Sequence, residues 1–303
     1  MSYNPCVGTF ALAVAGFLSV QDPAEKTYDL SKANWKPFVG YQGRISEDVT
    51  EMGKVLLLSG EKIVKETRPF DTYSFTATQD ILGADDEGLG TMRFAFARAT
   101  ARKARQDLKY GFHEKVVVAK GGAEGDWQFT LEGGKALEKD DLAALRGLLM
   151  TPRNRKKGDP DEGGLVSSPK PVKVGESWTP PVKPFAKAVM GDDGLADVEL
   201  AKATSRMTLK AVSTRDGVLF GRVEATYELP VLRFGGAKLD QAILVRSTTE
   251  IDTCIDGKLP DTVCDVKLEI RGKATTTAPG ARHSLNLEVD WTRTTSLFWK
   301  TVK

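Results

Sequence analysis

Two cysteines, Cys254 and Cys264, are the residues whose type and spacing point most directly to chemistry. They flank an Asp256-Gly257 turn signal that lies between two strand-like runs. Such a pair could form a disulfide in an oxidising compartment, provided that the two α-carbons lie within about 7 Å. A two-residue turn would instead place the thiols on opposite faces, about 17 Å apart along the strand. We therefore expect two small buried side chains, although a bulge near Pro260 would permit the disulfide.

Other reactive residue types are sparse or scattered. The two histidines, His113 and His283, lie far apart, and no cysteine or histidine pair has the spacing of a metal site. Gly88-Leu89-Gly90 lacks the third glycine and following helix of a dinucleotide loop, and no nucleophile elbow occurs. We predict no catalytic residue, no metal and no cofactor, and the ligand-binding residues stay unknown.

Paired carboxylates are the catalytic arrangement that the composition leaves open, because acidic residues are plentiful. Asp126 precedes Trp127 and Asp290 precedes Trp291, and an acid beside tryptophan could line a sugar-binding cleft. Such a dipeptide is more often a core aromatic next to a solvated acid. A hydrolase acting on an envelope polymer is therefore kept as an alternative hypothesis.

The overall charge argues against nucleic acid as a partner. The 303 residues include 43 Lys and Arg against 41 Asp and Glu, a formal net charge of +2. Two basic stretches, Arg98–Lys109 and Arg153–Lys157, contain no interleaved aromatics for base stacking. We expect solvated surfaces at both.

The amino-terminal region predicts export. Residues 6–20 carry no charge, but they are shorter than the roughly 20 residues that span a bilayer. This length is typical of the apolar part of a signal peptide, so we predict a signal peptide at 1–21 and a polar tether at 22–40. We therefore expect a periplasmic or extracellular protein. A buried amino-terminal strand or helix is the alternative.

The elements that must position any site are mainly β. Residues 41–150 predict a first β-meander that ends in a helix at about 140–150, where Asp140 can cap a leucine stripe. Residues 151–172 are rich in Pro, Gly and charge and predict an exposed connection. Residues 173–303 predict a second meander. The fold class is mainly β with one clear helix, as a large antiparallel sheet or half-barrel or as two related halves.

Two turn signals in the second meander predict long hairpins, because apolar faces must match across the pair. A three-residue loop at Arg215–Gly217 sets Leu209 opposite Val223 and Met207 opposite Ala225. It also sets Val212 opposite Phe220. It predicts Gly217 in the left-handed conformation, with a bulge.

The second hairpin turns at Asp256-Gly257. A two-residue turn there sets Val245 opposite Leu268 and Ile243 opposite Ile270, with a charged row on the other face.

The segment Pro171–Trp178 reads P-V-K-V-G-E-S-W, and together with the preceding helix and loop it resembles a family of exported bacterial β-rich proteins of unknown function. The likeness spans roughly residues 41–300. It implies a signal peptide and two β-meanders joined by a helix and loop, and it brings no catalytic residues. Gly175 would allow a tight turn, and Trp178 would plug the sheet where the chain enters its second half.

These observations favour an exported, non-enzymatic binding or envelope-associated protein. A curved sheet could hold a lipid or another apolar small molecule, and envelope components are the other expected partners. A structural or assembly module that pairs through exposed sheet edges is a further alternative.

Overall fold

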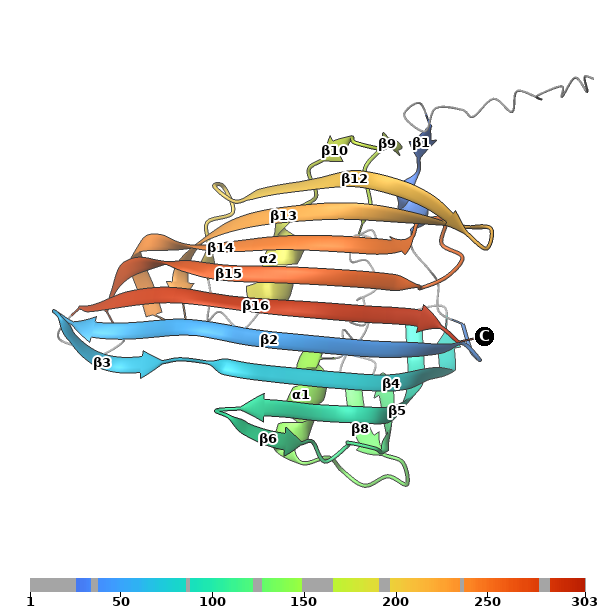
Figure 1. Cartoon of the computed structure of the whole chain (residues 1–303), viewed down its shortest axis with the longest axis horizontal. Coiled ribbons are helices and arrows are strands. Elements are labelled where there is room, and N and C mark those ends of the chain that lie inside the picture. Colours follow the sequence, from blue (N-terminus) through green and yellow to red (C-terminus); the bar gives the residue numbers. More distant parts are fainter. Residues whose placement is uncertain are drawn as a thin grey trace, which may run out of the picture.

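The computed structural model describes residues 26–33, 38–85, 88–121, 127–148, 166–190, 197–234, 237–277 and 284–302. Fourteen strands form one antiparallel sheet, which confirms the mainly β fold (Figure 1). The first half contributes β2 (Gln42–Ser59), β3 (Lys62–Thr67), β4 (Phe70–Asp85), β5 (Gly88–Lys103), β6 (Gln106–Lys109), β7 (Val116–Gly121) and β8 (Trp127–Leu131). The second half contributes β10 (Ser177–Trp178), β11 (Asp197–Val198), β12 (Thr204–Arg215), β13 (Val218–Phe234), β14 (Ala237–Cys254), β15 (Thr262–Thr277) and β16 (Leu285–Thr301).

The two predicted meanders join into a single sheet. Its order is β10-β12-β13-β14-β15-β16-β2-β4-β5-β7-β8, and β3, β6 and β11 pair at its sides. The junction is the pairing of β16 with β2, which runs without a register shift from Asn286 opposite Leu58 to Thr301 opposite Gly43. In the described part of the chain β10 and β8 do not pair, so the sheet is open.

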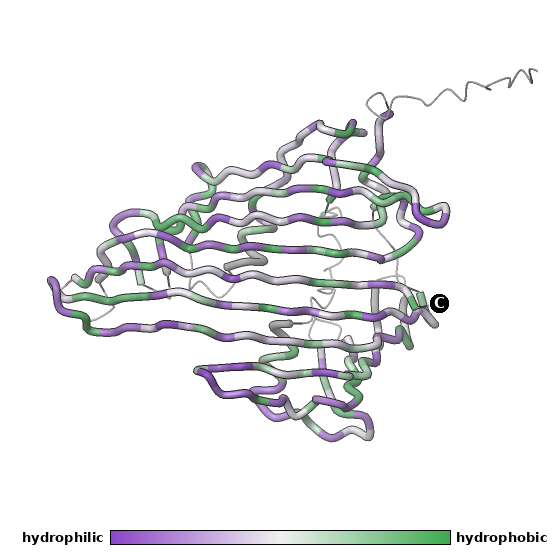
Figure 2. Tube along the Cα trace, in the orientation of Figure 1, coloured by the Kyte–Doolittle hydropathy of each residue, from purple (hydrophilic) through white to green (hydrophobic). Residues whose placement is uncertain are grey.

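One face of the sheet, here called the inner face, carries both helices, α1 (Lys139–Leu148) and α2 (Val182–Met190) (Figure 1). Because side chains alternate along a strand, every second residue points to this face. Buried apolar residues gather there in three clusters, one under α1, one around Trp178 and one under α2. Apolar and polar positions therefore interleave along the long strands (Figure 2).

Helix α1 confirms the predicted helix, and its Leu145 is fully buried, but it begins at Lys139, so Asp140 lies in the first turn and not at the cap. Helix α2 was not predicted, because Pro184 lies within it. Proline is tolerated in the first turn of a helix, where the backbone N–H has no partner inside the helix. Phe185 of α2 stacks on Tyr227 of β13 with the ring centroids 3.7 Å apart.

Two of the predicted residue pairs form in the β12–β13 hairpin, although the length of the turn and the position of the bulge differ from the prediction. Its turn has two residues, Asp216 and Gly217, both at positive φ (50° and 76°), and not three. A register shift between Leu209 and Ala211 then restores Leu209 opposite Val223. Met207 opposite Ala225 is also confirmed, whereas Ser213 and not Val212 faces Phe220. The extra residue thus sits inside the strand and not at the turn.

The β14–β15 pair has the predicted faces but a register displaced by two residues. Val245 faces Ile270 and not Leu268, because the strands end at Cys254 and resume at Thr262. The intervening loop includes Gly257 at φ 71°. A shift of two preserves the face of every side chain, so the apolar matching argument could not detect it.

Residues 26–33, which lie within the predicted tether, pack against the second half of the chain. β1 (Thr27–Tyr28) pairs with β9 (Val172–Lys173) as a small second sheet, and Leu30, in the short 3-10 helix Leu30–Lys32, is fully buried. The end of the predicted exposed connection is also packed, since Val166 and Val172 are buried. Burial of these few apolar side chains offsets the conformational entropy that is lost when the otherwise polar segments become ordered. The predicted signal peptide and residues 149–165 lie outside the described residues.

Candidate functional site

The two cysteines are separate free thiols in the structure. Cys264 faces Ile251 on the inner face, and Cys254 lies three residues further along β14 and on the other face. That spacing corresponds to about 10 Å along the strand. Burial raises the pKa of the Cys264 thiol to about 11, so it is protonated at neutral pH and a poor nucleophile.

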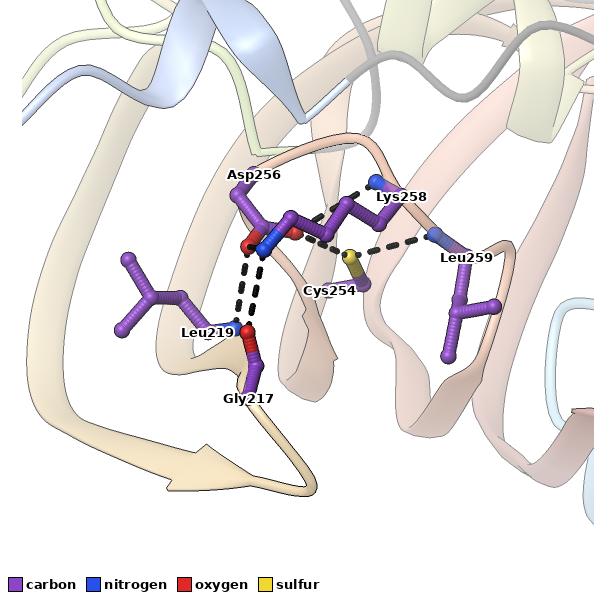
Figure 3. Close-up of polar contacts among 6 residues, drawn as sticks. All are labelled: Gly217, Leu219, Cys254, Asp256, Lys258 and Leu259. Atoms are coloured by element: carbon purple, nitrogen blue, oxygen red, sulfur yellow. Dashed lines mark hydrogen bonds and ion pairs between the residues drawn. The ribbon is translucent and has the colours of Figure 1, made fainter.

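The Cys254 thiol belongs to a latch between two turns (Figure 3). The Asp256 carboxylate accepts hydrogen bonds from the Leu219 N–H (3.2 Å), the Lys258 N–H (3.3 Å) and the Cys254 thiol (3.1 Å). The Lys258 ammonium donates to the Gly217 carbonyl (3.0 Å). Burial alone would raise the pKa of Asp256, but these hydrogen bonds lower it below its ordinary value. The latch thus joins the β12–β13 turn to the loop that follows β14.

The residues of the V-G-E-S-W segment lie at the β10 edge of the sheet. Gly175 has φ 87°, and the Glu176 carboxylate accepts the Lys173 N–H (3.0 Å) across this turn. Trp178 is buried opposite Met207, and its indole N–H donates to the Ser167 carbonyl (3.0 Å).

The remaining candidates from the sequence do not come together. His113 Nδ1 accepts the Ala99 N–H (3.0 Å) beside a turn. Asp290 is exposed on the outer face and pairs with Arg271, whereas Trp291 is half-buried on the inner face. Asp126 and His283 lie outside the described residues. Within the described ranges, no group of three or more His, Cys, Asp or Glu side chains could hold a metal ion.

A polar cluster in the middle of the inner face was not predicted. It is formed by Glu47 and Glu51 of β2, Asp71 and Tyr73 of β4, Lys103 of β5 and Arg293 of β16. The sequence did carry a signal for it. Ile45, Glu47, Val49 and Glu51 share one face of β2, so two acids stand at positions where the strand should be apolar.

Glu47 is the most unusual member of this cluster. Its side chain is only 9% exposed, and it faces Phe75 on one side and Leu297 on the other. Among the residues that the structure describes, it has no hydrogen-bond or ion-pair partner. Burial raises the pKa of Glu47 to about 7, and the Arg293 charge only partly opposes this. The carboxyl group therefore exchanges its proton near neutral pH.

Glu51 and Arg293 form the ionic part of the cluster. They face each other across β2 and β16, with Arg293 Nη1 3.5 Å from Glu51 Oε1. Burial raises the pKa of Glu51 in spite of this arginine. Asp71 faces Glu51 from β4, and the Lys103 ammonium lies 5.4 Å from the centre of the Tyr73 ring.

The surroundings of Glu47 are apolar but incompletely buried. Ile45, Leu297 and Trp291 on the same face are each half-buried, and each packs against a different one of the three core clusters. The middle of the inner face therefore combines an unpaired carboxyl with apolar side chains that are partly accessible.

No protein-family model and no characterised protein sequence matches the chain. Among solved structures, the mainly β chain weakly resembles P47 from Clostridium botulinum A2. That comparison covers 92% of this chain and 83% of that chain, at 9% sequence identity and a TM-score of 0.18.

The helices of the described residues are all too short or too polar to cross a membrane.

Proposed function

We propose that the chain is a non-enzymatic binding protein that holds an amphipathic molecule on the inner face of its sheet. The apolar body of the molecule packs on the half-buried side chains of β2 and β16, and a donor group of its polar end hydrogen-bonds to Glu47. The observation that supports this is the position of Glu47: the residue is only 9% exposed, and its carboxyl oxygens, which keep a narrow contact with solvent, have no hydrogen-bond or ion-pair partner among the described residues.

A donor on a ligand would lower the energetic cost of burying Glu47. An ionised carboxylate that is taken out of water without a partner costs several kcal/mol, and a neutral one still loses its hydrogen bonds to water. Glu47 keeps only a narrow contact with water, and no donor among the described residues replaces the rest of its hydration. An amine or hydroxyl donor on a ligand would satisfy Glu47, while the apolar neighbours Ile45, Phe75 and Leu297 would accept a hydrocarbon chain.

Export and association with the cell envelope form part of the same proposal. The uncharged run at residues 6–20 and the likeness of Pro171–Trp178 to the exported β-rich family support it. Cell fractionation with amino-terminal sequencing tests this part: recovery of the uncleaved chain in the cytoplasm alone would reject it.

The binding test uses dodecylamine, which has a hydrocarbon chain and a donor headgroup, in titration calorimetry of the full chain at pH 8. We expect saturable binding that weakens at least about tenfold in Glu47→Gln, because a charge-assisted hydrogen bond is lost. Glu250→Gln is the matched control, since Glu250 is exposed on the outer face, where it forms an ion pair with Arg222. Absence of saturable binding, or equal affinity in Glu47→Gln, would reject the proposal.

A hydrolase is the second candidate, because Glu51 and Asp71 face each other on neighbouring strands and Arg293 lies 3.5 Å from Glu51. Glycoside hydrolysis uses two carboxyl groups that flank the scissile bond, and Glu51 and Asp71 are the facing pair that could supply them. Release of soluble fragments from isolated envelope polysaccharide, lost in both Glu51→Gln and Asp71→Asn but kept in Glu250→Gln, would favour this candidate over simple binding.

A further inference from the structure

The outer face of the sheet has a hollow of about 460 Å³ beside the V-G-E-S-W segment. Its floor consists of Arg206, Thr208 and Lys210 of β12 with Glu224 and Thr226 of β13, and Gly175 lies at its wall. These floor residues alternate with Met207, Leu209 and Val223, which are buried on the inner face. The hollow is therefore separate from the inner-face cluster.

The V-G-E-S-W segment builds the wall of this hollow. The Gly175 N–H donates to the Leu209 carbonyl (2.7 Å), and the Leu209 N–H donates to the Glu176 carbonyl (3.1 Å). Gly175 adopts φ 87°, where a β-carbon would be strained. The Glu176 carboxylate is engaged elsewhere, since Lys170 Nζ lies 2.9 Å away. The one acid of the segment thus has its own cationic partner.

Arg206 is the unneutralised charge in the hollow. Its Nε and Nη2 donate to the Ser177 hydroxyl oxygen at 3.1 and 3.0 Å, and that oxygen lies 2.8 Å from the Thr208 hydroxyl. In the part of the chain that the structure describes, Arg206 has no acidic partner. Lys210 differs, because its ammonium lies 2.8 Å from Glu224.

Two other arginines of the outer face, Arg215 and Arg246, are neutralised. Arg215 pairs with Asp252 at 2.6 Å, and Arg246 pairs with Glu228 at 2.6 Å. A guanidinium has five N–H donors, so Arg206 keeps three after its two bonds to Ser177. Planar donors of this kind match an oxyanion in a bidentate arrangement.

We infer that this hollow binds a single phosphate or carboxylate group carried by a small polar molecule, with Arg206 as its anchor. The Thr208 and Thr226 hydroxyls provide neutral hydrogen bonds beside the charge. The Lys210–Glu224 pair adds no net charge, so the floor carries a net charge of one and favours one anionic group. The V-G-E-S-W segment then has a binding role, since it both walls the hollow and supplies the serine that orients Arg206.

The experiment is titration calorimetry of the full chain with inorganic phosphate and, separately, with glucuronate, at constant ionic strength. We expect at least one of them to bind, and Arg206→Gln to weaken that binding about tenfold or more. The phosphate and glucuronate arms distinguish a phosphoryl from a carboxylate ligand. Arg222→Gln is the control, since Arg222 is an outer-face arginine paired with Glu250 at 3.4 Å.

Arg206→Lys keeps the charge and removes the planar fork, so it should lie between the wild type and Arg206→Gln. The circular dichroism of each variant should match the wild type, because Arg206 is exposed. Failure of the wild type to bind either probe, or equal affinities in wild type and Arg206→Gln, would overturn the inference. Neither result bears on dodecylamine binding at Glu47, so the two proposals can fail separately.

Discussion

The substitution Glu47→Gln should remove a pH dependence of folding stability that a single buried carboxyl group creates. The folded-state pKa of Glu47 is about 7, against an ordinary value of 4.5. Below pH 4.5 both the folded and the unfolded chain hold the proton, so the group makes no pH-dependent contribution to stability. Between pH 4.5 and 7 only the folded chain holds it, so the free energy of unfolding falls as pH rises.

The size of the effect follows from the pKa difference. Each pKa unit corresponds to about 1.36 kcal/mol, so the full loss between pH 4.5 and 7 is about 3 kcal/mol, with no further loss above pH 7. Glutamine does not titrate, and Glu47→Gln should therefore lose this slope. Its unpaired amide adds a cost that is the same at every pH. The free energy of unfolding should therefore depend on pH differently in the two proteins, whatever constant difference in stability separates them.

The assay is urea unfolding of both proteins between pH 4 and pH 8 at constant ionic strength, followed by tryptophan fluorescence. From pH 4 to pH 8, the free energy of unfolding of Glu47→Gln should rise by about 3 kcal/mol relative to that of the wild type. Glu51 shifts in the same direction but is present in both proteins, so its contribution cancels. Glu250→Gln, which changes an exposed acid, should retain the wild-type slope. Identical slopes in wild type and Glu47→Gln would refute the assignment of a buried, unpaired carboxyl.

Three further substitutions or modifications test the fold. Gly53→Ala should destabilise by about 2–4 kcal/mol in urea unfolding, because a β-carbon there would press on the backbone carbonyl of Asp290; unchanged stability would contradict the β16–β2 pairing. Asp256→Ala should cost about 1–3 kcal/mol, since the latch donors lose their acceptor, and a neutral result would mean that water replaces it. Alkylation in urea without reductant should label both Cys254 and Cys264 in a peptide map, whereas protection of both until reduction would reveal a disulfide.

The alternation of apolar and polar residues predicted which face of a strand each side chain occupies, but it did not predict the exact register of the hairpins. The alternation in β12 and β13 was sufficient to pair Leu209 with Val223, because a face mismatch would bury charge. It did not locate the bulge, since a three-residue turn and a bulge within the strand give the same pairs beyond it. The two-residue displacement of β14 against β15 escaped for the same reason: period-two patterning repeats after two residues.

The polar cluster could not be derived in full, because it depends on contacts between distant segments. Glu47 and Glu51 could be recognised as acids on an apolar face of a strand. Their partners could not, since Arg293 lies more than 200 residues away and meets Glu51 only when β16 pairs with β2. The isolation of Glu47 is a property of that pairing, in which Leu297 and not a basic residue faces it.

The two proposed sites should act independently, and this follows from the architecture of the sheet. Arg206 lies on β12 and Glu47 on β2, with four strands between them. At about 4.8 Å per strand, five spacings separate the sites by about 24 Å along the sheet, and they open to opposite faces. Sites this far apart without shared partners normally contribute additively. The double variant Glu47→Gln, Arg206→Gln should therefore show each single defect unchanged, and a change in anion affinity caused by Glu47→Gln would mean that the sheet couples its two faces.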